Sequence, residues 1–295
     1  MVILGSVQQA LDLTLRLVVA PGERVWMEDP GYPGARQLMK ASGVAMVEVP
    51  VDREGLQVEA ALGLAADARL AYVTPSHQAP LGGELSPARR LALLRWASER
   101  GSYIFEDDYD SEYRFVAKPI PALRSMPGAD ASVILAGTFS KLLFPSLRLA
   151  YVVLPPQLVD GFTRLVSLTA RHANSLSQAV LADFIEQGHF DRHLRRMRKL
   201  YAARAEAFAD AAERHWQELI EVPPIRAGLD VVCRLHGIDE LAAQARLAEA
   251  GIDVMPLQLY GVKPQAPGLV MGFAPYREAA IEQAAREVAR LLRRR

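Results

Sequence analysis

The sequence has little cysteine, no long apolar run and no excess of either charge, and each absence excludes a class of protein. Cys233 is the only cysteine, which excludes an internal disulfide and any multi-cysteine metal site and agrees with a reducing cytoplasm. No apolar run reaches the roughly 18 residues of a membrane-spanning helix, and the first residues lack the features of a signal peptide. Lysine plus arginine and aspartate plus glutamate balance at 34 each, so no basic field indicates nucleic-acid binding. We therefore expect a cytoplasmic protein that contacts neither a membrane nor nucleic acid through this chain.

The length of 295 residues allows one large core, or a main domain with a smaller one beside it. Helical and strand patterns alternate through the first part of the chain, as they do in α/β proteins. From Pro223 the pattern changes to that of a smaller α+β unit, with strands expected at 230–235, 252–255 and 269–273. We predict a large α/β domain at residues 1–190, followed by a connecting helix and a small C-terminal domain at residues 191–295.

The segment 192–214 is rich in arginine and predicts a long helix. A basic run of this kind can indicate a nucleic-acid or membrane surface. Leu194, Met197, Tyr201 and Phe208 nevertheless keep to one stripe, which is typical of a helix that packs against a core. We expect a connecting helix with an exposed basic side.

A lysine-containing loop, residues 137–148 (GTFSKLLFPSLR), follows an apolar run that predicts a buried strand. Lys141 lies just past the strand end, and apolar neighbours desolvate a lysine, which favours the neutral amine that attacks carbonyl groups. Thr138, Ser140 and Arg148 are the donors that a phosphate ester needs. A lysine for an aldehyde and donors for a phosphate together suggest pyridoxal phosphate (PLP).

An acidic run, EDDYDSEY at residues 106–113, follows the predicted strand 103–105. Its carboxylates suit a solvated face, a divalent metal site, or a partner for a protonated pyridine nitrogen. The apolar strand carries the first carboxylates to the carboxyl edge of the sheet, which favours the pyridine partner, and the glycine spacing of a calcium loop is missing. His77 follows another strand in the same way, but a single loop histidine is more often solvated than functional.

Two turns complete the candidate site. Residues 5–8 (GSVQ) open a helix, and free backbone N–H groups at the positive end of a helix form an anion site; a plain Ser6 N-cap is the alternative. Tyr32 lies at the centre of a rigid turn of two prolines and two glycines, from which its ring can face a heteroaromatic ring. The alternative is a tyrosine that packs on its own loop.

Five motifs carry a family resemblance: GSVQQALDL, EDPGYPGAR, YVTPSHQAPLGG, EDDYDSEYRF and GTFSKLLFPSLRLAY, which begin at Gly5, Glu28, Tyr72, Glu106 and Gly137. With them the chain resembles the fold-type-I PLP-dependent aminotransferases of class I/II. Most closely it resembles the aminotransferase-like domain of MocR/GntR-type transcriptional regulators, and the similarity continues through GHFDRHLRRMRKLYAAR to the C-terminus. The resemblance implies an α/β fold with a mixed, mostly parallel sheet, helices on both faces and a smaller C-terminal α+β domain. It also implies PLP as cofactor and a homodimer.

The resemblance assigns roles to individual residues. It implies that Lys141 forms the Schiff base with PLP and, once displaced by an amine, moves the proton at the α-carbon. Asp107 would pair with the pyridine nitrogen, Tyr109 would donate to the 3-hydroxyl oxygen, and Tyr32 would stack on the ring. The phosphate would be held by Val7, Gln8, Thr138, Ser140 and Arg148.

Three departures from the family pattern limit what the resemblance implies. Ser6 stands where members often have glycine, and the segment 269–273 (LVMGF) lacks the arginine that clamps the substrate carboxylate in many aminotransferases. Arg36 or Arg277 would have to take that place. The chain also begins at the phosphate turn, and nothing in it resembles the winged helix-turn-helix of MocR regulators.

Two functions are therefore compatible with the sequence. The first is a PLP-dependent aminotransferase that acts on an amino acid or amine and a keto acid. The second is a sensor domain of a MocR-type regulator, which uses PLP and an amine to shift a dimer and whose DNA contacts lie outside this chain. The catalytic residues permit the first, and the missing carboxylate arginine favours the second.

Overall fold

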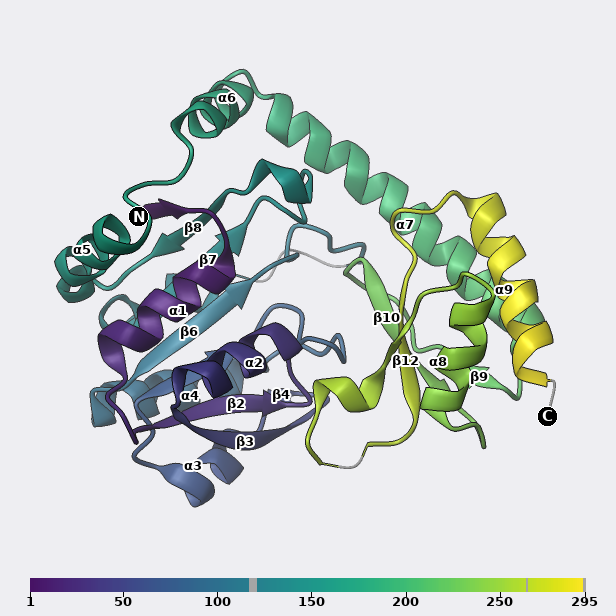
Figure 1. Cartoon of the computed structure of the whole chain (residues 1–295), viewed down its shortest axis with the longest axis horizontal. Coiled ribbons are helices and arrows are strands. Elements are labelled where there is room, and N and C mark those ends of the chain that lie inside the picture. Colours follow the sequence, from purple (N-terminus) through teal and green to yellow (C-terminus); the bar gives the residue numbers. More distant parts are fainter. Residues whose placement is uncertain (117–120, 264, 294–295) are drawn as a thin grey trace. The chain divides into compact units, whose positions relative to one another are not determined.

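The computed structural model of the chain describes residues 1–116, 121–263 and 265–293 (Figure 1). These residues form two compact units. The first unit consists of the described residues of 1–79, 83–111 and 120–191, and the second consists of those of 80–82, 112–119 and 192–295.

The first unit is built on an eight-stranded mixed sheet with the strand order β1-β8-β7-β6-β5-β2-β3-β4. Neighbours from β3 through β2, β5 and β6 to β7 run parallel, whereas β1, β8 and β4 pair antiparallel. The central strands are short apolar runs because both of their faces are covered. The bounds of the strands are β1 (Val2–Leu4), β2 (Arg24–Asp29), β3 (Ala45–Asp52), β4 (Gly55–Leu56), β5 (Leu70–Val73), β6 (Tyr103–Asp108), β7 (Val133–Thr138) and β8 (Ala150–Val153).

Helices cover both faces of this sheet, which confirms the predicted fold class. One face carries α1 (Val7–Val18), α2 (Pro33–Ser42) and α5 (Val159–Thr169), which share one apolar core with the sheet. The opposite face carries α3 (Val58–Ala65) and α4 (Pro87–Arg100), where Trp26 stacks on Trp96 with ring centroids 3.9 Å apart. The helix α4 begins with Ser86 as N-cap and Pro87 at its first position.

The strand directions bring several loops to one edge of the sheet, which we call the carboxyl edge. The parallel strands β2, β5, β6 and β7 end there, the antiparallel β8 begins there, and β1 ends there. Across β1, β8 and β7 the register aligns Leu4 with Ala150 and Ala150 with Thr138. Segments that are far apart in the sequence therefore meet at this edge, where open α/β sheets bind ligands.

The second unit is built on a four-stranded antiparallel sheet of order β11-β12-β10-β9. Its apolar core lies between the sheet and three helices, as the α+β pattern predicts. The elements are α7 (His189–His215), β9 (Ile220–Glu221), β10 (Asp230–Leu235), α8 (Glu240–Glu249), β11 (Met255–Pro256), β12 (Gly268–Gly272) and α9 (Glu278–Arg293). The basic stretch of α7 buries Leu194, Ala205 and Phe208, so it belongs to a helix that packs, as expected.

The strand predicted at 252–255 is largely wrong, because only Met255 and Pro256 pair with β12. Proline cannot donate to a ladder, and here the following backbone donors are taken by a side chain instead. The buried Glu240 carboxylate accepts from the N–H groups of Leu257 and Gln258, each at 3.1 Å, and of Gly268 at 2.9 Å. A carboxylate at the start of α8 thus takes the backbone donors that follow β11.

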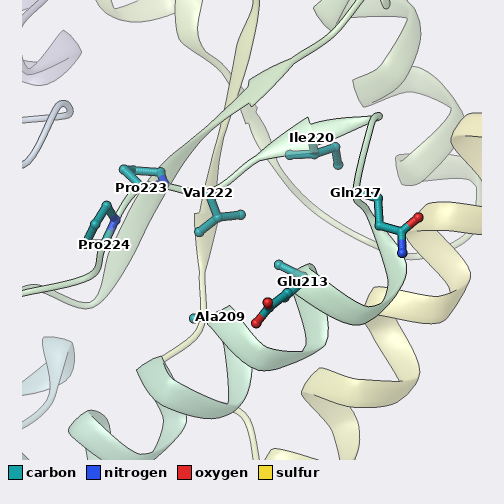
Figure 2. Close-up of a pocket in the computed structure, with 8 residues that line it drawn as sticks. Ala209, Glu213, Gln217, Ile220, Val222, Pro223 and Pro224 are labelled. Carbon is teal, nitrogen blue, oxygen red and sulfur yellow. The ribbon is translucent and has the colours of Figure 1, made fainter.

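A surface groove of about 620 Å³ lies on the second unit (Figure 2). Ala209, Glu213 and other residues near the end of α7 form one side, and Pro223 and Pro224 form the other. Glu213 is the one charged side chain among the lining residues and is exposed, so the groove holds no buried polar group that would orient a ligand.

Among the helices that the structure describes, none is both long and apolar enough to cross a membrane.

Candidate functional site

The segments expected to bind the phosphate meet at the carboxyl edge of the first unit. Residues 5–8 follow β1, residues 138–141 end β7 and follow it, and Arg148 precedes β8. The Phe139 N–H donates to the Leu149 carbonyl at 3.1 Å, and a Cβ placed on Gly5 would lie 3.9 Å from the Arg148 carbonyl oxygen. The sheet register therefore brings the three segments together, although more than 120 residues separate the first from the others.

The N-terminus of α1 has the features of an anion site. Ser6 is the N-cap: its hydroxyl accepts from the Gln9 N–H at 3.1 Å, while Gln9 Oε1 accepts from the Gly5 N–H at 3.0 Å. The first-turn N–H groups of Val7 and Gln8 have no acceptor within the helix, because no earlier turn exists. Ser6 has φ −168°, an extended conformation that does not require the glycine found in many family members. The N-cap role and the anion site are therefore compatible.

The Gln8 side chain has another partner. Its Nε2 donates to the Gly34 carbonyl at 2.9 Å, which joins α1 to the first turn of α2. The backbone N–H of Gln8 has no acceptor within α1, so it fits the expected phosphate contact better than the side chain does.

Lys141 lies three residues beyond the end of β7 and is exposed. The expectation that its apolar neighbours desolvate it is wrong for the described chain. Phe139 turns away to pack on Tyr151 and Phe190, with ring centroids 5.8 and 5.9 Å apart, and Phe144 is itself exposed. The side chains that flank Lys141 in sequence therefore do not bury its amine.

The hydroxyl residues beside Lys141 form a tight turn. The Ser140 N–H donates to Thr138 Oγ1 at 3.0 Å, so the Thr138 hydroxyl keeps its own hydrogen for a further acceptor. Arg148 is exposed and has φ 52°, a left-handed conformation at the end of the short helical turn Pro145–Leu147. The predicted phosphate donors Thr138, Ser140 and Arg148 thus lie on two adjoining loops.

Asp107 is a buried carboxylate with one oxygen paired and one unpaired. The Tyr72 hydroxyl donates to Asp107 Oδ2 at 2.6 Å, whereas Oδ1 has no hydrogen-bond partner among the described residues. Burial raises the pKa of Asp107 to about 7, although the hydrogen bond from Tyr72 opposes this shift. A protonated ring nitrogen would give Oδ1 its missing donor and favour the charged carboxylate. Asp107 therefore fits the pyridine partner of PLP.

Tyr32 is the N-cap residue of α2 and is partly exposed. Its ring lies across Gly34, because a Cβ on Gly34 would come within 2.5 Å of the ring. Burial and the charge of Asp107 raise the pKa of the Tyr32 hydroxyl, so the two side chains are electrostatic neighbours. This placement is compatible both with stacking on a cofactor ring and with packing on its own loop.

His77, which as a single loop histidine was expected to be solvated, lies beside the candidate site residue Tyr109. It is buried, its Nδ1 lies 2.9 Å from Asp110 Oδ2, and the Tyr109 hydroxyl lies 3.1 Å from the same nitrogen. Tyr72 likewise shows no sign of a site residue in the sequence beyond its place in an apolar run. The one sequence signal for both is their position at the end of β5, next to the strand that carries Asp107.

Three buried carboxylates, Glu28, Glu106 and Asp107, form what we call the buried carboxylate trio. The Glu28 carboxylate accepts from the Thr74 hydroxyl at 2.7 Å, and Glu106 accepts from the Leu123 and Arg124 N–H groups at 2.6 and 2.8 Å. Burial raises the pKa values of Glu28 and Glu106 to about 7. The beginning of the acidic run is therefore not a solvated face, and the described residues contain no group of three ligands arranged for a metal ion.

Arg36 is not a spare anchor for a substrate carboxylate. Its side chain is buried, forms ion pairs with Asp29 and Glu48, and donates to the Glu28 carbonyl at 3.0 Å. The other arginine considered, Arg277, is exposed and precedes α9 in the second unit. Arg36 therefore holds β2, β3 and α2 together.

The chain matches the family described as aminotransferase class I and II over residues 1–287. It belongs to that family. Among curated relatives it is 42% identical to the probable rhizopine catabolism regulatory protein MocR of Rhizobium meliloti, over 92% of this chain and 55% of that protein. It is 36% identical to the uncharacterized HTH-type transcriptional regulator YdeL of Bacillus subtilis, over 96% of this chain and 61% of that protein. The chain thus spans little more than half the length of these regulators.

Among solved structures the chain is similar to LysN, the α-aminoadipate aminotransferase of Thermus thermophilus, complexed with N-(5'-phosphopyridoxyl)-L-leucine. The TM-score is 0.90 at 27% identity, over 98% of this chain and 76% of that one. The fold-type-I aminotransferase fold predicted from the sequence is therefore confirmed, as is the resemblance to MocR-type regulators.

Proposed function

We propose that the chain is the PLP-binding, effector-sensing domain of a MocR-type transcriptional regulator. The observation that carries the proposal is the order of the similarities: relatives named as regulators reach 42% and 36% identity, whereas the aminotransferase LysN reaches 27%. The absence of an arginine from β12 and the structural use of Arg36 support it, because an aminotransferase needs an anchor for the substrate carboxylate. DNA contacts are not assigned to this chain.

The residues at the carboxyl edge fit PLP. Lys141 would hold the aldehyde carbon, and Asp107 Oδ1 would accept from the ring nitrogen. Tyr109 would donate to the 3-oxygen, and Tyr32 would cover the ring. The N–H groups of Val7 and Gln8 with Thr138, Ser140 and Arg148 would hold the phosphate. When bound, PLP supplies an electrophilic carbon for amines and a ring that withdraws electrons. Asp107 would keep that ring nitrogen protonated, and Lys141 would be the base that moves a proton at the α-carbon.

A second copy of the chain is the proposed partner. The helix α6 (Ser175–Glu186) buries only Leu181, while Leu176 and Val180, which lie one turn apart on the same side of the helix, are exposed. An apolar helix face of this kind marks an interaction surface. We expect a homodimer by light scattering, and we expect Val180→Lys to shift the protein towards the monomer; a wild-type monomer would contradict the role of this face.

A transaminase is the second candidate, because the lysine and aspartate that such an enzyme needs are both present and LysN has the same fold. A panel of amino acids and amines separates the two functions. PLP-loaded protein is mixed with each compound in turn. The absorbance of the cofactor reports displacement from Lys141, and a separate assay measures keto-acid release.

We expect at least one amine to displace the lysine with less than one keto acid released per cofactor over the course of the assay. Lys141→Ala is the control, since it has no lysine to be displaced. Repeated turnover with a keto-acid acceptor would contradict the sensor proposal and support the enzyme. A wild-type chain that takes up no PLP would contradict both.

A further inference from the structure

Tyr109, His77 and Asp110 form a hydrogen-bonded chain of side chains at the carboxyl edge. His77 Nδ1 lies 2.9 Å from Asp110 Oδ2 and 3.1 Å from the Tyr109 hydroxyl oxygen. The rings of His77 and Tyr109 are tilted, with centroids 5.9 Å apart. His77 and Asp110 are both buried, so water does not compete for these hydrogen bonds.

Asp110 determines the direction of the hydrogen bonds. A carboxylate oxygen can only accept, so a nitrogen 2.9 Å away has to carry hydrogen. The same Nδ1–H then also faces the Tyr109 oxygen, which acts as an acceptor. An Nδ1 without hydrogen would instead point its lone pair at a lone pair of Asp110 Oδ2, which is repulsive. The hydroxyl hydrogen of Tyr109 is therefore turned away from His77.

Burial strengthens the pairing of Asp110 with His77. Asp110 Oδ1 is buried without a hydrogen-bond partner among the described residues, so the bond from His77 to Oδ2 is the one that compensates this carboxylate for lost water. Without that bond both carboxylate oxygens of Asp110 would be buried and unpaired, which is unfavourable. The ring form with hydrogen on Nδ1 is therefore the stable one.

The loop that carries His77 is held in place on both sides. The Gln78 N–H donates to the Gly83 carbonyl at 2.7 Å, and Gln78 Nε2 donates to the Pro30 carbonyl at 2.9 Å. On the other side the Pro75 carbonyl accepts from the buried Arg90 at 2.8 Å. These bonds fix the backbone on either side of His77, from which its imidazole reaches Tyr109.

We propose that Asp110 and His77 orient the Tyr109 hydroxyl so that its hydrogen is donated to the 3-oxygen of the PLP ring. The proposal rests on the PLP site proposed above, and it makes His77 a positioning residue that acts through Tyr109. A donor to that oxygen stabilises its negative charge. In the bound state that oxygen would share a proton with the nitrogen that links Lys141 to the cofactor. By stabilising the deprotonated oxygen, the donor lowers the pH at which this proton is lost.

The first test needs no cofactor. In apo protein labelled with 15N-histidine, the resonances of the six histidines report which ring nitrogen carries hydrogen, and the His77→Asn spectrum identifies those of His77. We expect Nδ1 of His77 to be protonated. A neutral ring with hydrogen on Nε2 and none on Nδ1 would overturn the proposal, whether or not the chain binds PLP.

The second test follows the absorbance of PLP-loaded protein across pH. Tyr109→Phe should raise the midpoint by about one pH unit, the size expected for one hydrogen bond to a charged oxygen. His77→Phe should raise it similarly on its own and not at all in the Tyr109→Phe background, since the two residues act as a unit. His77→Asn, whose amide N–H can replace Nδ1–H, should keep the wild-type midpoint. The exposed His172→Phe is the matched control and should change nothing.

The outcomes separate the role of His77 from the PLP site itself. An unshifted midpoint in His77→Phe, or a shift that persists in the Tyr109→Phe background, overturns the positioning role and leaves the site standing. A melt of the apo variant would show whether His77→Phe folds. If it does not, Asp110→Asn provides the same test, because an amide at position 110 no longer requires hydrogen on Nδ1 of His77. A wild-type chain that takes up no PLP overturns the proposed function, and with it the role of Tyr109 towards the cofactor.

Discussion

Tyr72→Phe should weaken PLP binding by changing the charge of Asp107 while leaving the fold in place. The Tyr72 hydroxyl donates at 2.6 Å to Asp107 Oδ2, and both residues are buried. A hydrogen bond to a charged group is worth about 1.5 to 3 kcal/mol, which corresponds to about one to two pH units. Because this bond favours the charged carboxylate, its loss should raise the pKa of Asp107 from about 7 by that amount.

The consequence for PLP depends on pH. Near pH 7 about half of Asp107 is charged in the wild type but only about one tenth to one hundredth in the variant, and the protonated form cannot pair with a protonated ring nitrogen, so we expect affinity to fall by about 5- to 50-fold. At pH 9 at least about half of Asp107 would be charged in the variant, and the loss should shrink to about twofold or less. The assay is a titration of apo protein with PLP at both pH values, followed by cofactor absorbance, together with thermal melts of the apo proteins.

Tyr103→Phe is the matched control. Tyr103 lies on the same strand as Asp107 but at the opposite end, so its hydroxyl is remote from the site and PLP affinity should stay unchanged. Wild-type affinity of Tyr72→Phe at pH 7 would refute the reasoning. A loss of equal size at pH 7 and pH 9 would also refute it, because such a loss would come from packing and not from ionisation.

Three further predictions follow from the same edge of the sheet. Lys141→Ala should fold normally, since the side chain is exposed, but its PLP-treated spectrum should lack the lysine-bound cofactor; an unchanged spectrum would exclude Lys141 as the anchor. Gly137→Ala should cost about 1 to 3 kcal/mol of stability and weaken PLP binding. Its Cβ would lie 2.4 Å from Tyr151, whereas Gly63→Ala meets nothing within 4 Å and is the control for urea unfolding. The buried carboxylate trio should make the apo chain less stable as the pH rises from about 5 to 7, by about 1.4 kcal/mol per pH unit for each carboxylate, with little change above pH 7. The sign follows from pKa values raised to about 7 on folding, because the folded chain then binds protons that the unfolded chain has released. In urea unfolding, Asp107→Asn should reduce the slope of stability against pH. A stability that rises over this pH range would contradict the assignment.

Local patterns predicted most of the secondary structure. Apolar runs predicted the central strands, and the Ser86-Pro87 pair is a local signal for the start of α4, because strand burial and helix capping depend on residues close together in the sequence. The strand at 252–255 failed for the opposite reason. Only its last residue, Met255, pairs with β12, and the next backbone donors, those of Leu257 and Gln258, are taken by the Glu240 carboxylate, a partner that no local pattern reveals.

The sequence by itself determined the family, the fold class and the motifs that carry Lys141 and Asp107, because each motif joins an apolar strand to a polar loop within one short segment. Only the tertiary structure decided how the carboxylates are paired. Tyr72 reaches Asp107 across 35 residues, and His77 reaches Asp110 across 33. Which hydroxyl or ring meets which carboxylate depends on the pairing and register of β5 and β6, which the helix α4 separates in the chain. The exposure of Lys141 and the ion pairs of Arg36 were decided in the same way, since burial and charge pairing depend on the whole sheet and its helices.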